Sequence, residues 1–426
     1  MTENGALYSY LTHEFIHPIR DPLWGHIYVT SAMKSIIYSH EFQRLNGIRQ
    51  LGPAFLVYPG ATHTRLSHSL GVFEIAKRTL RALLRSEELD CVTVAGAKAF
   101  LCASILHDLG HYPYAHSLKE LPLTEHERLT ARFIRESELN EIIRDRVGTD
   151  PNLVAAIVDL SDTSVDGAEV RLYRRILSGV LDPDKLDYLN RDAYFCGVSY
   201  GTQDIDFVLS KLDYRQEFGL MLDVDGLTAV ENVLFSKYLM YRAVYWHRSV
   251  RAATAMIKKA VNLAMIDGEI VPEDLYGIDD AEFDEKLLDR DYHSFDLIRR
   301  VSRRNLHTCV YEAPAESNPE LVERLADLRG RAKFEAEVAK RLSRRLGRPV
   351  PTESIVVDIP EPISFESDLT IDLGDRRAAF PESGSVFDSG VVAGFSRSLR
   401  RIGLFVDSDL EFDIQDPASL MDGIEI

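Results

Sequence analysis

Residues 92–116 read VTVAGAKAFLCASILHDLGHYPYAH, a nearly apolar run that ends in several histidines around one aspartate. Because apolar residues occupy every side of the helix predicted over 92–108, we expect that helix to be buried in the core. Gly110 and Pro113 then stop it. The stretch therefore predicts a core helix that carries ionisable side chains at its C-terminal end.

The neighbouring side chains of His107 and Asp108 are costly to bury unless each is paired or bound. A divalent metal ion satisfies both, since imidazole and carboxylate suit Mn, Fe, Zn or Mg in mixed nitrogen and oxygen sites. A bare His-Asp pair more often has a simpler explanation, a capping aspartate beside a surface histidine. The nearby histidines His111 and His116 favour the metal site.

Two further candidate ligands lie far away in the sequence. His68 stands at the start of an amphipathic helix predicted over 67–85, and Asp184 falls in the first turn of another helix. Taken alone, each has an ordinary explanation, a structural histidine and a carboxylate favoured near a helix N-terminus. However, Asp184, Tyr188 and Asp192 recur every four residues and share one helix face. Such a face is more typical of a pocket wall than of a solvated surface.

The composition excludes several classes of protein. A formal net charge of −18 argues against a protein that mainly grips nucleic acid. The four cysteines form no CxxC pair, which argues against a zinc ribbon or a disulfide framework and favours the reducing cytoplasm. No apolar run approaches the roughly 20 residues that span a bilayer, and the N-terminus does not resemble a signal peptide. We therefore expect a cytoplasmic protein without a membrane segment.

The residue patterns predict a mainly α fold with a smaller α/β region at the C-terminal end. Helical patterns cover 67–85, 92–108, 126–146 and 151–160, with a short strand and turn in 17–30 and a hairpin in 218–226. Residues 227–265 form either one long helical stretch or two consecutive ones. Beyond residue 300 we expect a helix over 319–346, edge strands within 351–374, an irregular loop over 372–390, and a helix leading to a strand within 391–406. These patterns predict a helical catalytic core, 1–300, and a mixed α/β region, 301–426.

Several motifs resemble those of the HD superfamily. His68, His107-Asp108 and Asp184 are similar to its H…HD…D pattern, and further motifs in the same order resemble its dNTP triphosphohydrolase-like branch. These further motifs are residues 25–27, 42–45, 50–52, 59–65, 68–71, 107–111, 184–192 and 245–247. The resemblance covers roughly residues 15–260, with the HD motif region at about 60–195. It implies an HD-domain helical core.

The resemblance implies a metal-dependent enzyme that hydrolyses a deoxynucleoside triphosphate to a deoxynucleoside and tripolyphosphate. The implied ligands of its divalent ion (Mn, Mg, Fe, Zn, Co or Ni) are His68, His107, Asp108 and Asp184. By the same resemblance, His111 and His126 lie beside the α-phosphate, one as general acid–base and the other stabilising charge. Without the resemblance, His126 would be interpreted as a surface residue at a helix start.

One position departs from the family pattern. Family members carry an acidic residue three places after the position of His116, where it orients the catalytic histidine. This chain has Lys119 there, and the nearest acid is Glu120. Either Glu120 takes the orienting role or proton transfer is arranged differently.

The resemblance also implies a set of substrate-binding residues. Arg65, Lys185 and Lys237 match phosphate contacts, although Lys237 replaces an arginine and offers a point charge in place of a bidentate contact. Tyr188 and Tyr245 match residues that pack on the deoxyribose, and Gln50 and Asp192 match residues that bind its 3′-hydroxyl. Three residues complete the expected substrate-binding set: Leu51, His116 and Tyr241.

Other functions stay open at this stage. The same metal centre would also suit a nucleotidase or a phosphatase acting on another phosphorylated metabolite. A catalytically silent nucleotide sensor is a further alternative. Regulated relatives bind guanine nucleotide with an Asp and an Arg, whereas this chain has Tyr38 and Asn46 at those positions, so we do not expect the same activator site. By resemblance, we expect a nucleotide substrate and a homo-oligomer, from dimer to hexamer.

Overall fold

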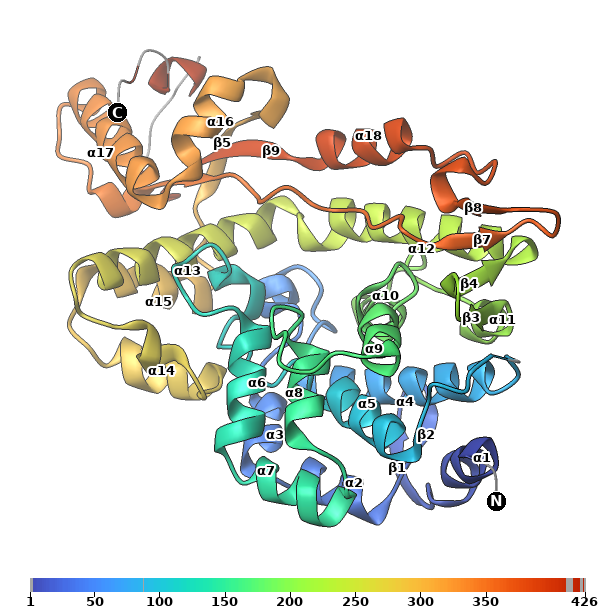
Figure 1. Ribbon diagram of the computed structural model, residues 1–426. Coiled ribbons are helices and arrows are strands. Elements are labelled where there is room, and N and C mark those ends of the chain that lie inside the picture. The colour runs from blue at the N-terminus through green and yellow to red at the C-terminus, as the bar shows by residue number, and fades with distance from the viewer. Residues whose placement is uncertain (1–2, 87, 411–416, 422–423, 425–426) are drawn as a thin grey trace.

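The computed structural model describes residues 3–86, 88–410, 417–421 and 424 (Figure 1). The described chain is mainly helical, with small sheets beside the helices, which confirms the predicted fold class. Within these residues, no helix is both long and apolar enough to cross a membrane.

Two helices form the centre of the core. Helix α5 (Val94–Leu106) begins at Thr93, whose hydroxyl accepts a hydrogen bond from the Gly96 amide, and it is buried along most of its length. It packs against α4 (Arg65–Leu83) and α8 (Pro151–Val158), and α4 packs in turn against α10 (Pro183–Cys196). The ends of α4, α5 and α10 therefore meet in the middle of the fold.

Shorter elements surround this core. Strands β1 (His17–Asp21) and β2 (Gly25–Val29) form an antiparallel hairpin within 17–30, where the sequence predicted a short strand and a turn. The surrounding helices are α1 (Glu3–His13), α2 (Ser31–Ile37), α3 (His40–Arg44), α6 (His126–Glu136), α7 (Leu139–Glu141), α9 (Ala168–Ser178) and α11 (Ile205–Ser210).

The amphipathic stretch 126–146 is helical but divided into shorter segments. Helix α6 ends at Ser137, whose backbone is extended and whose hydroxyl accepts a hydrogen bond from the Leu139 amide at the start of α7. A π-helical turn, η4 (Ile142–Val147), follows α7. The local serine–backbone bond competes with helix continuation, which the charge pattern alone does not reveal.

The predicted helical stretch 227–265 consists of two helices in one line. Helix α12 (Leu227–Met240) leads through the π-helical turn η6 (Tyr241–Tyr245) into α13 (Arg248–Ile266), and Figure 1 shows them crossing the molecule. Helices α14 (Asp280–Leu288) and α15 (Asp296–Ser302) follow, and α15 packs on α13.

Beyond residue 300 the chain is mixed α/β, as the patterns predicted. One sheet has the order β5-β9-β6, formed by β5 (Thr308–Pro314), β9 (Arg401–Val406) and β6 (Ile355–Asp358). The accompanying helices are α16 (Pro319–Ala326), α17 (Leu328–Leu346) and α18 (Ser389–Leu399).

A second sheet joins the C-terminal region to the rest of the molecule. Its order is β3-β4-β7-β8, from β3 (Leu212–Arg215), β4 (Gly219–Asp223), β7 (Thr370–Asp372) and β8 (Arg377–Ala379). Strand β7 pairs parallel with β4, so residues on both sides of residue 300 share this sheet. The stretch 372–390, predicted to be irregular, contains β8, because β7 supplies an antiparallel partner that no local pattern announces.

Buried ion pairs tie the long helix to the C-terminal region. Arg251 on α13 donates two hydrogen bonds to the carboxylate of Asp358, at 2.6 and 2.7 Å, and Lys259 lies 2.8 Å from Glu335 on α17. All four side chains are largely or fully buried. Loss of one partner in such an ion pair leaves a buried charge unpaired, so these pairs hold the two regions in one arrangement.

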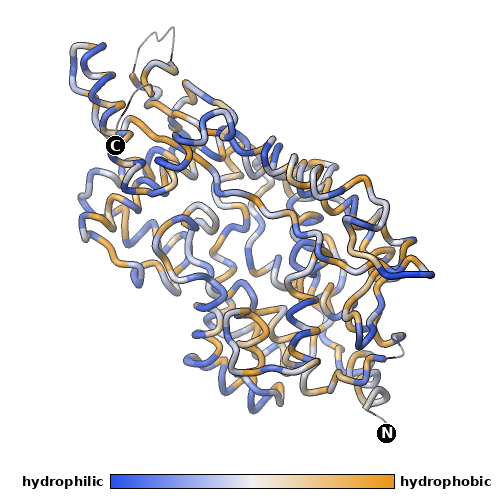
Figure 2. Tube along the Cα trace, turned by 45° about the horizontal axis from the view of Figure 1, so that its top comes forward, coloured by the Kyte–Doolittle hydropathy of each residue, from blue (hydrophilic) through white to orange (hydrophobic). Residues whose placement is uncertain are grey.

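Elsewhere, hydrophobic and hydrophilic residues alternate along the helices (Figure 2), as expected where each helix buries one face.

The close contact between α4 and α10 depends on a residue without a side chain. A Cβ atom added to Gly71 would collide with the carboxylate of Asp187 and the guanidinium of Arg191, which form a buried pair. We expect Gly71→Ala to lower the free energy of unfolding by about 3 kcal/mol, since a buried ion pair cannot move aside cheaply. Chemical denaturation measures this value.

The control for Gly71→Ala is Gly394→Ala in α18, where an added Cβ meets nothing within 4 Å. That change should leave stability equal or slightly higher, because alanine is the better helix former. If both variants unfold at the same denaturant concentration as the parent chain, the tight contact is not a constraint on the fold.

Candidate active site

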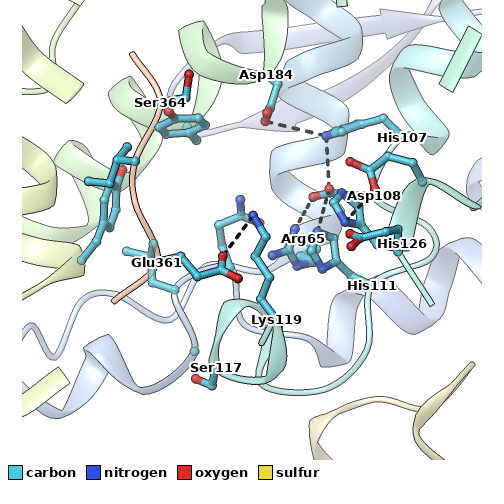
Figure 3. Close-up of a pocket in the computed structure, with 18 of the residues that line it drawn as sticks. Arg65, His107, Asp108, His111, Ser117, Lys119, His126, Asp184, Glu361 and Ser364 are labelled. Atoms are coloured by element: carbon cyan, nitrogen blue, oxygen red, sulfur yellow. Dashed lines mark hydrogen bonds and ion pairs between the residues drawn. The ribbon is translucent and has the colours of Figure 1, made fainter. Parts of the chain in front are cut away.

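A cavity of about 890 Å³ opens where the ends of α4, α5 and α10 meet. Its wall also includes residues of α6, of the η6 turn, and of the segment 360–366 from the C-terminal region. Figure 3 shows the ionisable side chains pointing into this space. The sequence motifs predicted that residues of α4, α5 and α10 belong to the site. No motif predicted the contribution of the segment 360–366.

The four expected metal ligands lie close together in this cavity. Ligand atoms of His68, His107 and Asp184 all lie within 4.8 Å of one another. His68 Nε2 lies 2.9 Å from Asp184 Oδ1, and His107 Nε2 lies 3.4 Å from Asp108 Oδ1 and 3.8 Å from Asp184 Oδ1. Helices α4 and α10 and the end of α5 thus supply two imidazoles and one carboxylate that face one another. Asp108 lies beside them and also groups with His111 and His126.

Hydrogen bonds on the side away from the cluster fix the tautomers of His68 and His107. His68 Nδ1 donates to Asp187 Oδ2 at 2.8 Å, and His107 Nδ1 donates to the Ser104 carbonyl at 2.9 Å. Both Nε2 atoms therefore face the cluster with a lone pair available when the ring is neutral. The buried Nε2 of His107 has no hydrogen-bond partner among the described residues. An orphaned acceptor between two carboxylates suits a bound cation, so these residues fit a divalent metal ion.

Asp187 is the supporting residue that the sequence analysis missed. Its carboxylate is fully buried and accepts hydrogen bonds from His68, from Trp24 Nε1 at 2.5 Å, and from Arg191 Nε at 2.7 Å. Arg191 also contacts Asp21 at 2.9 Å. The signal was available, because Asp187 stands three residues after Asp184 in the quoted motif, but its helix face differs from that of Tyr188 and Asp192.

The electrostatic environment favours positive charge between the candidate ligands. Burial alone lowers the pKa of a histidine, but the hydrogen-bonded carboxylates of Asp184 and Asp187 outweigh it and raise the pKa of His68 to about 10. Burial likewise opposes the charge on His107, whereas Asp108 and Asp184 raise its pKa above the ordinary value. A divalent cation can meet the same demand with both imidazoles neutral.

His111 and His126 form a stacked pair beside the cluster. Their ring centroids are 4.0 Å apart at an interplanar angle of 23°, and His111 Nε2 lies 3.3 Å from Asp108 Oδ1. Burial and the nearby Arg65 hold the pKa of His111 well below its usual range, and burial also lowers the pKa of His126. Both rings are therefore neutral at pH 7, the form in which an imidazole can accept a proton.

Arg65 offers hydrogen-bond donors that protein groups do not use. Its Nη1 lies 2.5 Å from Asp108 Oδ2, whereas its buried Nε and Nη2 have no partner among the described residues. Because a buried guanidinium with unused donors is costly, the arrangement suits a bound anion next to the metal cluster.

The residues expected to bind the sugar also gather in the cavity. Tyr245 donates to Asp192 at 2.6 Å, and the rings of Tyr188 and Tyr241 lie edge-on to that of Tyr245, at 6.3 and 5.0 Å. The buried Gln50 Oε1 has no partner among the described residues, and Leu51 lines the same wall. A supporting residue was missed here too: the imidazole of His63 lies 2.8 Å from Asp192 and stacks on Phe195.

The two lysines expected to contact phosphate have protein partners. Lys237 donates to Glu366 at 3.0 Å and to the Ser364 carbonyl at 2.7 Å. Lys185 contacts Asp182, the N-cap residue of its own helix, at 2.5 Å and lies 3.6 Å from Glu366. Lys119 lies 3.7 Å from Glu361 at the cavity (Figure 3). The segment 360–366 therefore places carboxylates among the cations of the site.

The proposed orienting role of Glu120 is not supported by its contacts and needs correction. Its carboxylate contacts Lys258, and it lies 3.0 Å from Arg331, so both of its oxygens are held by cations of α13 and α17. Burial raises the pKa of Glu120, but these two cations outweigh it and lower the pKa below its usual range. Glu120 therefore belongs to the ion pairs that join the two regions. The side chain of His116 lies outside the described part of the chain.

Two protein-family models match the sequence. The model of the HD domain matches residues 65–189, and the model of the HD-associated region matches residues 204–419. A crystal structure of a hypothetical protein from Aquifex aeolicus is also similar, with a TM-score of 0.70 and 29% identity over 92% of this chain and 96% of that one.

Curated relatives are longer than this chain. The uncharacterized protein MJ1154 of Methanocaldococcus jannaschii is 33% identical over 293 residues, 68% of this chain and 58% of that protein. The deoxynucleoside triphosphate triphosphohydrolase SAMHD1 of Danio rerio is 25% identical over 384 residues, covering 73% of this chain and 58% of its own length. The chain thus spans little more than half the length of these relatives.

The role of Asp187 as a support for His68 gives a first test. We expect Asp187→Asn to weaken divalent-metal binding by about 10- to 100-fold, because the neutral amide no longer strengthens and orients the imidazole. Calorimetric titration with Mn²⁺ measures the affinity, and circular dichroism of the metal-free chains checks folding. Asp206→Asn is the control, since that carboxylate is 88% exposed and 3.6 Å from Arg78. Unchanged affinity in Asp187→Asn would contradict the assignment.

The raised pKa of His68 gives a second test. A pKa of about 10 means that His68 holds a proton at pH 7 in the metal-free chain. A metal ligand must be neutral, so binding should release about one proton or more, and affinity should rise about tenfold per pH unit between pH 7 and 9. Titrations in two buffers of different ionisation enthalpy count the protons. Binding with no proton release at pH 7 would contradict the prediction that His68 is protonated in the metal-free chain and loses that proton on becoming a ligand.

Proposed function

The chain belongs to the HD-domain family, and we propose that it is a metal-dependent phosphohydrolase that cleaves deoxynucleoside triphosphates into a deoxynucleoside and tripolyphosphate. The observation that carries this proposal is one cavity that combines three features. These are the cluster of His68, His107, Asp108 and Asp184, the unused donors of Arg65, and the tyrosine-lined wall around Asp192. The cluster suits a divalent metal, the guanidinium suits a phosphate, and the wall suits a sugar.

In this proposal, His68, His107, Asp108 and Asp184 hold a divalent ion, for which manganese is one candidate. When bound, the ion supplies Lewis-acid stabilisation of the charge on the phosphate. Arg65 Nε and Nη2 bind a phosphate oxygen beside the cluster, which holds the reacting group in one orientation.

The stacked pair of His111 and His126 performs the proton transfers. Because the pKa of His111 is well below its usual range, its ring is neutral at pH 7 and can accept a hydrogen bond or a proton from water. His126, whose Nδ1 lies 3.2 Å from Glu127, is the second group that can hold a proton at the reacting phosphate. Glu120 takes no part, because cations occupy its oxygens.

The tyrosine-lined wall of the cavity would select the sugar. Tyr188 and Tyr245 pack beside the deoxyribose, and Gln50 and Asp192 bind its 3′-hydroxyl. Asp192 is held in place by His63 and Tyr245. Close packing of Tyr188 on the sugar would disfavour a 2′-hydroxyl. We further propose that the protein works in the cytoplasm as a homo-oligomer of two to six copies.

A second candidate is a phosphohydrolase for a less charged phosphate ester. Among the described residues that line the cavity, nine carry carboxylates and five are lysine or arginine. Several of the carboxylates surround the metal cluster, but Glu361 and Glu366 face lysines. A surplus of acids disfavours a polyanion unless metal ions accompany it.

One incubation series separates these candidates. The chain is incubated with Mn²⁺, Mg²⁺, Fe²⁺ or Co²⁺, together with each dNTP and NTP, alone and in mixtures, and with nucleoside monophosphates. We expect tripolyphosphate and deoxynucleoside from dNTPs, and no turnover in Asp108→Ala, which loses a metal ligand. Chromatography with mass detection identifies the products.

The control is Asp206→Asn, whose exposed carboxylate should not affect turnover. Orthophosphate from monophosphates alone would replace the first proposal by the second. Full activity in Asp108→Ala would contradict the proposed metal site itself.

A further inference from the structure

The segment 360–366 crosses the cavity and brings an acidic side chain to its most buried lysine. Lys237 is only 5% exposed, and its ammonium group donates to Glu366 Oε2 at 3.0 Å and to the Ser364 carbonyl at 2.7 Å. The same Glu366 oxygen lies 3.6 Å from Lys185. One carboxylate thus lies within 4 Å of two lysines, and it lines the cavity together with Lys237.

The rest of the segment is fixed to the C-terminal region. The carbonyl of Pro360 accepts a hydrogen bond from Arg400 at 2.7 Å, and that of Ile363 accepts one from Ser396 at 2.8 Å. Phe365 is buried, with its ring 5.6 Å from that of Phe395. These anchors hold the backbone, so movement of the Glu366 side chain alone withdraws its carboxylate from both lysines, while Lys237 keeps the Ser364 carbonyl and Lys185 keeps Asp182.

The ion pairs that Glu366 forms with the two lysines can be replaced by a more highly charged anion. A buried ammonium group needs a hydrogen-bonding anion, so the empty cavity requires a partner for Lys237. Glu366 fills that need, but its own side chain is 36% exposed, so solvent screens the pair. An anion with more charge than one carboxylate can therefore replace it, whereas a weakly charged group cannot.

We propose that Glu366 is a built-in competitor for the distal phosphates of the substrate. Its carboxylate occupies the Lys185–Lys237 position until a polyphosphate displaces it. The proposal rests on the proposed function, since it assumes a substrate with several phosphates. It makes Glu366 a specificity-determining residue: a triphosphate carries enough charge to replace the carboxylate, and a monophosphate does not reach or replace it.

The test measures binding of inorganic tripolyphosphate to the 426-residue chain by calorimetry. We expect Glu366→Gln to bind it about three- to tenfold more tightly, because the competing charge is gone while the lysines remain. Inorganic orthophosphate should bind weakly to both chains, and the ratio of the two affinities should rise in the variant.

The matched control is Asp368→Asn. This change removes one negative charge two residues away, but Asp368 is 85% exposed and pairs with Arg175, at 2.6 Å. It should change tripolyphosphate affinity by less than about twofold, as expected for an exposed charge. Lys237→Gln should weaken binding, and the double variant with Glu366→Gln should bind no better than Lys237→Gln alone.

Three results would overturn the proposal: equal affinity in Glu366→Gln and the parent chain, an equal gain in Asp368→Asn, or no tripolyphosphate binding in any chain. These outcomes are distinct from failure of the proposed function, which is decided by the products of turnover. A chain that cleaves dNTPs but shows no gain in Glu366→Gln keeps its function and loses this competitor.

Discussion

The buried carboxylate of Asp187 is the contact on which the site depends. It receives hydrogen bonds from a metal-ligand candidate, His68, from Arg191 and from Trp24, and thereby joins α4, α10 and the β1–β2 hairpin. A fully buried charge is stable only while such partners stay in place. Loss of the Asp187–Arg191 ion pair would therefore also disturb the orientation of the His68 imidazole. The absence of a side chain at Gly71 lets the two helices approach closely enough for this contact.

The cavity is a product of both parts of the chain. The HD-domain portion supplies the cluster around Asp108, and the portion matched by the HD-associated region supplies Lys237, Tyr245 and the segment 360–366. Buried pairs such as Arg251–Asp358 set the position of the second portion relative to the first. Glu120 also connects the two portions, through its ion pairs with Lys258 and Arg331. This explains why Glu120, although it is next to the position where an orienting acid was expected, has a structural role.

Groups of opposite charge lie next to each other throughout the cavity. Carboxylates surround the point where a cation is held, and Arg65 stands next to them with donors to spare. Further out, acidic residues of the segment 360–366 neutralise the lysines. An anion that binds here exchanges one set of partners for another, so the net gain is smaller than the number of cations suggests. Selectivity in such a cavity comes from the count and spacing of charges on the ligand.

The sequence by itself determined the helical character of the core, the buried helix before His107-Asp108, and the residues that could act together around it, because helical periodicity and ordered motifs are local signals. It missed strand β8 and did not reveal the break within the amphipathic stretch 126–146, since a short strand needs a distant partner and a serine–backbone bond outweighs helix propensity. Only the tertiary structure decided that Asp187 and His63 support the site, that Glu120 pairs with Lys258 and Arg331, and that Glu366 reaches Lys237. Those contacts join residues from 119 to 211 positions apart, and no sequence period relates them, because packing and the burial of charge choose such partners in three dimensions.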